Sequence, residues 1–400
     1  MLAATAAGQQ GPVAALVSTA GWAAAAERVL GESFVVTPSG ITDPQDLRSR
    51  GSAPTLTPAS PRALRRRAPV ELKTAVKDVR QWQRARSFSV DPTGPWSGAD
   101  VAFVWQRHDL FVTAGMDLAR ALGVPSVLFV PATLVWQARQ WGVRRRLWGS
   151  ALERLAERPA LVRADVVACG SELVAHEVRR IGVAPDRVVV TPSGVDLERF
   201  APGATANRRD ELGLSSRFVV GWVGSFRGFH AVEQAVEAVV GLDDATLLLV
   251  GDGPERSRIE RLALDRGVQA VFTGTVGHAE LPGYLAAMDV ALILGSPSGP
   301  FHYSPLKLGE YLAAGLPVIA PRVDELSSRL MDGEQAVFVP VGDLDALRGR
   351  LLELRDDPRR RAFLGANARA AAVATWGWDR AIETVLFAVN RPETARREVE

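Results

Sequence analysis

Twenty consecutive residues in the second half of the chain decide its fold, and they are Phe301-His302-Tyr303-Ser304-Pro305-Leu306-Lys307-Leu308-Gly309-Glu310-Tyr311-Leu312-Ala313-Ala314-Gly315-Leu316-Pro317-Val318-Ile319-Ala320. They predict a tight loop, an amphipathic helix, a Gly-Leu-Pro break and then a buried strand. A helix that leads directly into a buried strand is typical of parallel sheets with crossover helices. The segment therefore predicts an α/β fold.

The start of this helix also has the chemistry of a phosphate site. A loop that runs into a helix N-terminus presents free backbone N–H groups and the positive end of the helix dipole, which suits a phosphate. Lys307 adds a cation there, and Glu310, about one turn further along, can accept hydrogen bonds from a sugar diol. A phosphate site beside a diol acceptor is what a nucleotide requires.

Composition sets outer limits on the class of protein. The 400 residues, 47% hydrophobic and 23% charged, describe an ordinary globular chain with room for two domains. A net charge of +2 is too small to indicate nucleic-acid binding, and one cysteine, Cys169, excludes an intramolecular disulfide framework and argues against structural zinc. No apolar run reaches about 18 residues, and the first ten residues lack the basic start of a secretory signal. We therefore expect a cytoplasmic location.

Short Val-rich runs alternate with helical stretches in the first half of the chain, which predicts βαβ units and a parallel sheet. The expected strands are Val13–Ser18, Ser33–Thr37, Val101–Trp105, Ser126–Val130, Val166–Cys169 and Arg187–Thr191. The expected helices are Gly21–Leu30, Arg62–Arg86, Phe111–Leu122, Trp136–Arg158 and Ser171–Ile181, the last with Ser171 as its N-cap.

The same alternation repeats after a Pro- and Gly-containing turn at Thr191–Asp196, where the chain leaves the first domain. The strands expected in the second half are Phe218–Val223, Thr246–Val250, Ala270–Thr273, Val290–Leu294, Pro317–Ala320 and Ala336–Pro340. The helices expected there are Ala231–Val240, Glu255–Asp265, Leu281–Ala287, Leu306–Ala314, Asp343–Leu354, Pro358–Thr375 and Trp378–Val389.

Two motifs carry a family resemblance. Residues 304–311, Ser-Pro-Leu-Lys-Leu-Gly-Glu-Tyr, match the pattern Ser-Pro-x-Lys-x-x-Glu-Tyr found in a subset of the retaining glycosyltransferases of family 4 (group 1), which have the GT-B architecture. Residues 224–230, Gly-Ser-Phe-Arg-Gly-Phe-His, resemble the Gly-Ser-Phe-Arg/Lys-Pro-Trp-His loop of the same subset. The chain departs from the commoner family pattern at His302 and Ser225, which occupy the places of a Glu and an Arg.

The resemblance implies two Rossmann-like domains that face each other across a cleft. Residues 1–198 would bind the acceptor, residues 199–376 would bind a nucleotide-diphosphate sugar, and residues 377–400 would return to the first domain as a helix. The implied reaction is hexosyltransferase-like: a sugar passes to an acceptor hydroxyl with retention of anomeric configuration. We expect no cofactor beyond the nucleotide sugar and no metal, because Asp343-Leu344-Asp345 predicts a helix start rather than a metal loop.

The donor-site residues are assigned from these motifs. We expect Arg227 and Lys307, with the loop Ser304–Leu306 and its N–H groups, to hold the diphosphate, and Glu310 to hold the ribose. Pro305, which has no N–H, lines the same loop. The remaining wall of the donor pocket is assigned to Gly224, Ser225, His230, Gly251, Gly274 and Val276.

On the acceptor side we expect His108, just beyond a buried strand, to hydrogen-bond the sugar or the acceptor. Gly21, placed after the first expected strand, is a candidate seat for a small-molecule, glycan or lipid-linked acceptor. Two other functions stay open: a non-catalytic relative that only binds the nucleotide sugar, and a GT-B epimerase, which would need carboxylate bases.

One helical surface has two readings. Trp141, Trp148, Leu152 and Leu155 share a face of the helix expected at Trp136–Arg158, and Arg144, Arg145 and Arg146 lie beside them. The face is either a core stripe with a solvated Arg run or a peripheral contact with the inner face of the membrane.

Overall fold

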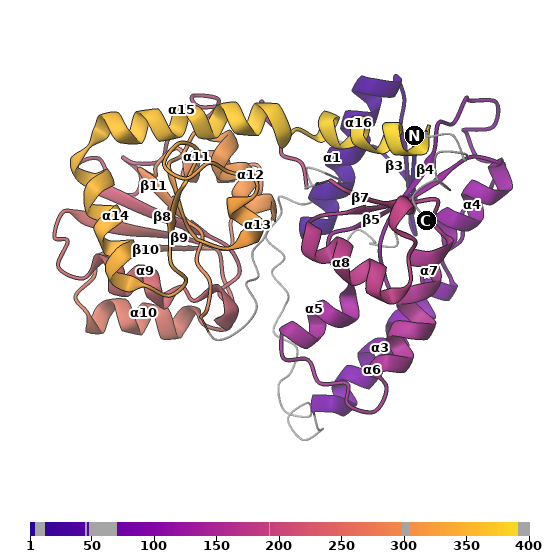
Figure 1. Cartoon of the computed structure of the whole chain (residues 1–400), viewed down its shortest axis with the longest axis horizontal. Helices are drawn as coiled ribbons and strands as arrows, with labels where there is room; N and C mark the ends of the chain where they lie inside the picture. Colours follow the sequence, from indigo (N-terminus) through magenta and orange to yellow (C-terminus); the bar gives the residue numbers. More distant parts are fainter. Residues whose placement is uncertain (5–12, 45, 48–69, 192, 298–304, 391–400) are drawn as a thin grey trace. The chain divides into compact units, whose positions relative to one another are not determined.

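The chain divides into two compact units, each with its own parallel sheet (Figure 1). The computed structural model describes residues 1–4, 13–44, 46–47, 70–191, 193–297 and 305–390. Unit 1 comprises Met1–Gly51, Thr55–Ser193 and Trp378–Glu400, and unit 2 contains Gly194–Gly377. The last range of unit 1 is therefore separated from the others by all of Gly194–Gly377.

The sheet of unit 1 has the strand order β3-β2-β1-β4-β5-β6-β7, and β3 is its one antiparallel member in the described chain. The chain order reverses between β1 and β4, which is where open α/β sheets bind ligands. The strands are β1 (Leu2–Ala4), β2 (Phe34–Thr37), β3 (Gly40–Thr42), β4 (Val104–Arg107), β5 (Ser126–Val130), β6 (Val166–Cys169) and β7 (Val188–Val190).

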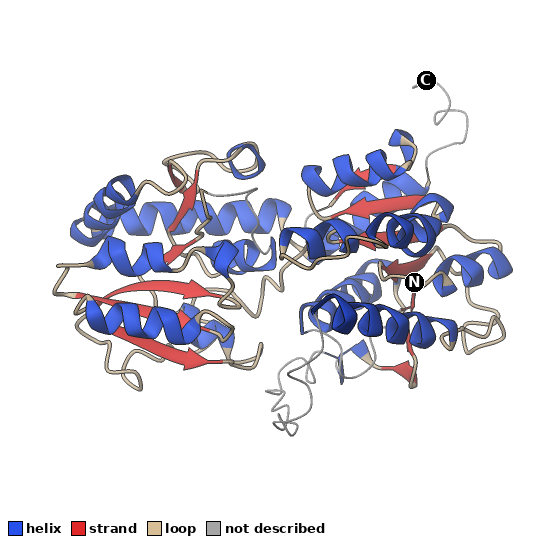
Figure 2. Cartoon of the chain, turned by 90° about the horizontal axis from the view of Figure 1, so that it is seen from below, coloured by secondary structure: helices blue, strands red, loops and turns tan. Residues whose placement is uncertain are grey.

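Helices cover both faces of this sheet (Figure 2). They are α1 (Val13–Leu30), α3 (Val70–Arg86), α4 (Ala114–Leu122), α5 (Leu134–Gln140), α6 (Gly149–Leu152), α7 (Arg158–Arg163), α8 (Glu172–Ile181) and α16 (Trp378–Val389), with a π-helical turn η1 (Glu153–Glu157) and a 3₁₀ turn η2 (Pro185–Arg187). The predicted N-cap of α8 is confirmed, because Ser171 Oγ accepts a hydrogen bond from Val174 N at 3.2 Å.

The last helix, α16, packs on α1 through a close contact. A Cβ atom added to Gly21 would lie 2.3 Å from Cε2 of Trp378, so only glycine allows the two helices to approach this closely. Trp22 next to it lies 6.3 Å from Trp378 between ring centroids, and Arg28 forms an ion pair with Asp379. The C-terminal helix is thus part of the core of unit 1.

Two expectations about α1 are therefore wrong. Val13–Ser18 is not a strand but the start of α1, and the first strand is Leu2–Ala4. The Ala-rich composition of Val13–Leu30 favours a helix. Gly21 consequently lies in mid-helix against Trp378 and does not follow a strand, so it cannot be the acceptor seat that was predicted there.

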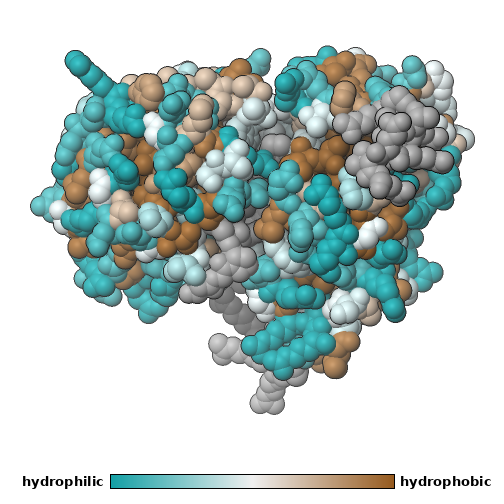
Figure 3. Space-filling model, in the orientation of Figure 1, coloured by the Kyte–Doolittle hydropathy of each residue, from teal (hydrophilic) through white to brown (hydrophobic). Residues whose placement is uncertain are grey.

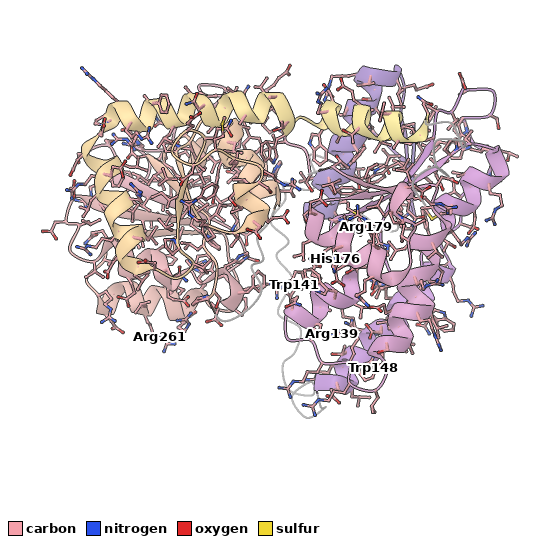
Figure 4. The ribbon with its side chains drawn as sticks, in the orientation of Figure 1. Arg139, Trp141, Trp148, His176, Arg179 and Arg261 are labelled. Carbon is pink, nitrogen blue, oxygen red and sulfur yellow. The ribbon has the colours of Figure 1, made fainter. Side chains whose placement is uncertain are left out.

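The helix predicted at Trp136–Arg158 is also wrong, because the chain breaks between α5 and α6. Gly142 has φ +73°, which a helix interior does not allow, and buried Asp78 of α3 accepts hydrogen bonds from Arg145 Nε and Nη2, both at 2.8 Å. Trp148 Nε1 donates to the same carboxylate at 2.9 Å, whereas Trp141 lies beside α5 (Figure 4). Trp141 and Trp148 therefore do not share a helical face.

The sheet of unit 2 is parallel throughout its described strands and has the order β10-β9-β8-β11-β12-β13. Numbered within the unit this is 3-2-1-4-5-6, the doubly wound Rossmann order, and the chain reverses between β8 and β11. The strands are β8 (Phe218–Val223), β9 (Ala245–Val250), β10 (Ala270–Gly274), β11 (Val290–Leu292), β12 (Val318–Pro321) and β13 (Val337–Val339).

Helices pack on both faces of the second sheet as well. They are α9 (Glu233–Val239), α10 (Arg256–Asp265), α11 (Leu281–Leu285), α12 (Pro305–Ala313), α13 (Asp324–Ser327), α14 (Leu344–Asp356) and α15 (Pro358–Thr375), together with a 3₁₀ turn η3 (Gly228–His230). Unit 2 has two hydrophobic clusters, one that contains Tyr311 and one that contains Trp222. The predicted α/β class with two Rossmann-like units is confirmed.

No helix in the described chain combines the length and apolarity that crossing a bilayer requires.

Candidate functional site

The strand ends next to the reversal point of unit 2 form one continuous backbone surface. Gly224 N donates to Val250 O at 2.9 Å, and Gly251 N donates to Gly274 O at 2.9 Å, so the loops after β8, β9 and β10 are linked. Gly251 has φ +125°, and a Cβ added to it would lie 2.0 Å from Gly224 O. Gly251 is therefore required for the loops to touch, and no side chain separates them.

Lys307, in the first turns of α12, brings a cation to this surface. Its side chain is buried, its Nζ lies 4.5 Å from the centroid of the Trp222 ring, and a Cβ on Gly224 would lie 3.2 Å from that nitrogen. Burial lowers the pKa of Lys307 to about 7, while the charge of Glu310 acts in the opposite direction. The amine is thus held near the end of β8 with its protonation balanced near neutral pH.

Glu310 is paired with a histidine that we did not predict. Its Oε1 lies 2.8 Å from Nε2 of His278, and the two side chains are 9% and 13% exposed. The ring of His278 in turn packs on Phe200 with 5.5 Å between centroids. His278 follows β10 by a few residues, so the strand-end argument that singled out His108 could have found it.

Tyr311 fixes the register of α12 against β8. Its hydroxyl oxygen accepts a hydrogen bond from Val223 N at 2.7 Å, and burial raises the pKa of Tyr311 well above its ordinary value. Because Lys307 and Tyr311 are four residues apart, they lie on the same side of the helix. The contact therefore holds Lys307 toward the strand end.

The other predicted donor residues fall into three groups. Ser225 and Arg227 lie exposed on the loop after β8, whereas the imidazole of His230 is buried 5.5 Å from Trp222. Val276 is half-buried against the core of unit 2, Pro305 and Leu306 begin α12, and Gly224, Gly251 and Gly274 form the surface described above. Ser304 and His302 lie outside the described residues.

His108, at the reversal point of unit 1, is fully buried in a second histidine–glutamate pair. Its Nε2 lies 3.0 Å from Oε1 of Glu157, a carboxylate in η1 that the sequence analysis missed. Glu157 also accepts hydrogen bonds from Leu134 N and, at 3.2 Å, from Val135 N, so it links His108 to the start of α5. Within the described chain, no three His, Cys, Asp or Glu side chains gather as a metal site would need.

Two family models match complementary parts of the chain. The Glycosyltransferase Family 4 model covers residues 21–199, and the Glycosyl transferases group 1 model covers residues 217–357. The chain belongs to glycosyltransferase family 4. Its membership confirms the resemblance found in the motifs around Arg227 and Glu310.

This family 4 chain is similar in sequence to two curated proteins over part of their length. One is the GDP-mannose-dependent alpha-(1-6)-phosphatidylinositol monomannoside mannosyltransferase of Mycolicibacterium smegmatis, which is 32% identical over 198 residues, 47% of this chain and 52% of that protein. The other is the D-inositol 3-phosphate glycosyltransferase of Acidothermus cellulolyticus, 32% identical over 263 residues. That match covers 60% of this chain and 57% of the relative, so the chain spans little more than half of either protein.

Among solved structures, Anabaena Alr3699/HepE in complex with UDP-glucose matches 97% of the family 4 chain and 99% of its own chain with a TM-score of 0.64 and 16% identity. WaaG, a glycosyltransferase involved in lipopolysaccharide biosynthesis, matches with a TM-score of 0.60. At these identities the likeness shows the fold, and it confirms the GT-B architecture.

Proposed function

We propose that the chain transfers a sugar from a nucleotide-diphosphate sugar to an acceptor hydroxyl, with retention of the anomeric configuration. The observation that carries the proposal is the position of Lys307 and Glu310 on α12, beside the reversal point of a doubly wound sheet. A cation there suits a diphosphate, and a carboxylate one turn later suits the hydroxyls of a ribose.

Departure of the nucleoside diphosphate is the demanding step, because negative charge builds up on its leaving oxygen. Arg227, on the loop after β8, and Lys307 would supply the positive charge, and the N–H of Leu306 at the start of α12 would add a fixed donor. These groups are held by the fold before the reaction begins, so they need no reorganisation as the charge develops. They would also let the reaction proceed without a metal ion.

Glu310 would orient the donor through its ribose. The hydrogen bond from His278 occupies Oε1 and limits the movement of the carboxylate, and Oε2 would accept a hydrogen bond from a ribose hydroxyl. A donor that is bound at both the diphosphate and the ribose has little freedom left for its anomeric carbon. Retention then follows if the acceptor hydroxyl approaches from the face that the diphosphate leaves.

The relatives named above act, by their names, on inositol 3-phosphate and on a phosphatidylinositol monomannoside. We infer that the acceptor of this chain is likewise a hydroxylated molecule, either soluble or linked to a lipid. His108 is the residue of unit 1 that we assign to its hydroxyl groups, since it lies at the end of β4 beside the reversal point.

A surface on α3 supports a peripheral contact with the inner face of the membrane. Leu72, Val76 and Val79 recur at helical spacing and are 55%, 44% and 52% exposed, with Lys73 and Lys77 between them. Figure 3 has the orientation of Figure 1, which labels α3 at the lower end of unit 1. At that lower end, Figure 3 shows hydrophobic residues among hydrophilic ones. An apolar stripe flanked by cations suits an anionic lipid surface. Vesicles of phosphatidylglycerol should sediment the protein, and Val76→Glu should release it.

The donor proposal is tested by a thermal-shift panel of UDP-, GDP-, ADP- and TDP-sugars. A nucleotide at 100 times its Kd stabilises the folded state by about 2.7 kcal/mol, so the correct donor should stand out. Transfer to an acceptor must then follow, and Arg227→Ala should reduce turnover with little change in melting temperature.

The same assays separate the two alternatives. A non-catalytic relative would bind the donor without turning it over. An epimerase would convert the donor sugar with no acceptor present. If no nucleotide sugar raises the melting temperature, the proposed function is wrong.

A further inference from the structure

We propose that His278 is a positioning residue of the donor site: it holds Glu310 apart from Lys307, so that both charges stay available to the nucleotide. The inference rests on the proposed function and adds to it a residue that determines specificity. It starts from two opposite charges, three positions apart on α12, that are not joined by any ion pair of the described chain.

Lys307 and Glu310 are placed where opposite charges normally pair. Residues at positions i and i+3 are neighbours on a helix surface, with about 5–6 Å between their Cβ atoms. Both residues are buried, at 5% and 7% exposed, and attraction between opposite charges is screened much less there than in water. If the two paired, the amine would be neutralised before a diphosphate arrived, and the carboxylate would be occupied before a ribose arrived.

Each of the two charges instead has a partner of its own. Lys307 Nζ lies 4.5 Å from the centroid of the Trp222 ring, whose face stabilises a cation. Glu310 Oε1 lies 2.8 Å from Nε2 of His278. Because an ionised carboxylate can only accept hydrogen bonds, Nε2 carries the hydrogen and donates it. His278 therefore takes the place beside the carboxylate that Lys307 would otherwise fill.

The loop that carries His278 is fixed by contacts of its own. Gly277 N donates to Glu280 Oε2 at 3.2 Å, and Arg208 Nη2 donates to Oε1 of the same carboxylate at 3.1 Å. The imidazole ring packs on buried Phe200, with 5.5 Å between the ring centroids. These contacts do not involve Glu310, so the imidazole sets the position of the carboxylate before any ligand binds.

Separation of the two charges affects the donor at both of its ends. Burial lowers the pKa of Lys307 to about 7, and the charge of Glu310 acts in the opposite direction. A carboxylate that moved onto the amine would raise this pKa further and would cancel the positive charge that a diphosphate requires. The same carboxylate would no longer accept hydrogen bonds from the ribose. His278 therefore determines the selectivity for ribonucleotides over their 2′-deoxy analogues.

The first test measures this selectivity by calorimetric titration of the full chain with UDP, GDP and ADP, and with the 2′-deoxy analogue of each one that binds. His278→Phe keeps a ring against Phe200 but removes the donor, whereas His278→Gln keeps an N–H donor and removes the ring. We expect selectivity for the ribonucleotide to fall about tenfold in His278→Phe and to be largely kept in His278→Gln. His278→Ala, which also lacks the donor, replaces His278→Phe if that variant is unstable.

The second test follows the amine itself in ¹³C-lysine spectra, which are simple because the chain has three lysines, Lys73, Lys77 and Lys307. Lys307→Met assigns the signal. In His278→Phe, Lys307 should titrate about one pH unit or more above the wild type, because Glu310 moves onto it, and adding Glu310→Gln should remove this rise. The other titratable groups nearby, Tyr311 on α12 and His230 after β8, are the same in every variant, so the difference reports the carboxylate.

Three results overturn the inference. They are unchanged selectivity in His278→Phe, unchanged titration of Lys307 in the same variant, and a loss of selectivity in His278→Gln as large as in His278→Phe, which would mean that the ring only packs. Each of them leaves the proposed function standing if the wild type still binds a nucleotide sugar and turns it over. Failure of every nucleoside diphosphate to bind the wild type, in contrast, removes the proposed function itself.

Discussion

Buried Lys307 makes the pH dependence of donor binding a sharp test of the proposed site. In the free protein its pKa lies at about 7 instead of the ordinary 10.5, because burial disfavours the charged form. A bound diphosphate places negative charge beside the amine and raises that pKa, so binding takes up a proton above pH 7. Each pH unit above 7 then weakens binding by up to about tenfold, until the pKa of the bound state is reached.

Folding stability should respond to pH in the opposite sense. Between pH 7 and about 10 the unfolded chain holds the Lys307 proton and the folded chain does not, so the free energy of unfolding rises with pH in this window. Below pH 7 both states are protonated, and the full cost of burying the charge is present. Lys307→Met should remove the contribution of Lys307 to both the stability slope and the binding slope.

The measurement is calorimetric titration with the nucleoside diphosphate from pH 6 to 9, with the melting temperature of the free protein recorded in the same buffers. We expect the dissociation constant of the wild type to increase at least about tenfold between pH 7 and 9. Lys307→Arg is the matched control, because arginine stays charged throughout and reports the titration of the ligand alone. Equal slopes for the wild type and Lys307→Arg would refute the reasoning.

Three further predictions concern contacts in the two units. Glu310→Gln should weaken binding of a ribonucleoside diphosphate about tenfold or more but that of its 2′-deoxy analogue much less, and equal losses in calorimetry would argue against a ribose contact. Gly251→Ala should lower the free energy of unfolding by about 3 kcal/mol in urea titrations, because its positive φ strains any other residue and the new Cβ would clash with the Gly224 carbonyl oxygen. In the control Gly228→Ala the new Cβ would meet no atom within 4 Å, so the free energy of unfolding should not fall in this way. Gly21→Ala should cost about 1–3 kcal/mol in the same assay through its clash with Trp378, and Gly349→Ala, in open space on α14, should be neutral or stabilising.

The central strands could be predicted from sequence because they are uninterrupted apolar runs. Ser126–Val130, Val166–Cys169 and Phe218–Val223 have the same bounds in the prediction and in the structure, as expected for parallel strands buried on both faces. The first strand, Leu2–Ala4, was missed because three residues, two of them alanine, carry little β preference. The break after Trp141 was missed because Asp78, which holds Arg145 and Trp148, lies far away in sequence.

The candidate site shows the same division between local and long-range information. Lys307 and Glu310 belong to one short motif, and the helix that carries them could be predicted from that motif alone. Their surroundings could not, since His278 reaches Glu310 from 32 positions earlier and Glu157 reaches His108 from 49 positions later. Periodicity reports which residues are helical or buried, but it does not report which distant side chains meet.

The discontinuity of unit 1 has a consequence for how the protein is made. Its core includes Trp378 of α16, and that helix leaves the ribosome only after Gly194–Gly377 has been synthesised. The stretch Gly194–Gly377 of unit 2 is continuous in sequence and can finish folding during translation. Nascent unit 1 must wait with the surface of α1 around Gly21 and Trp22 uncovered until the closing helix emerges, and in that interval it is the part of the chain most exposed to aggregation and to chaperones.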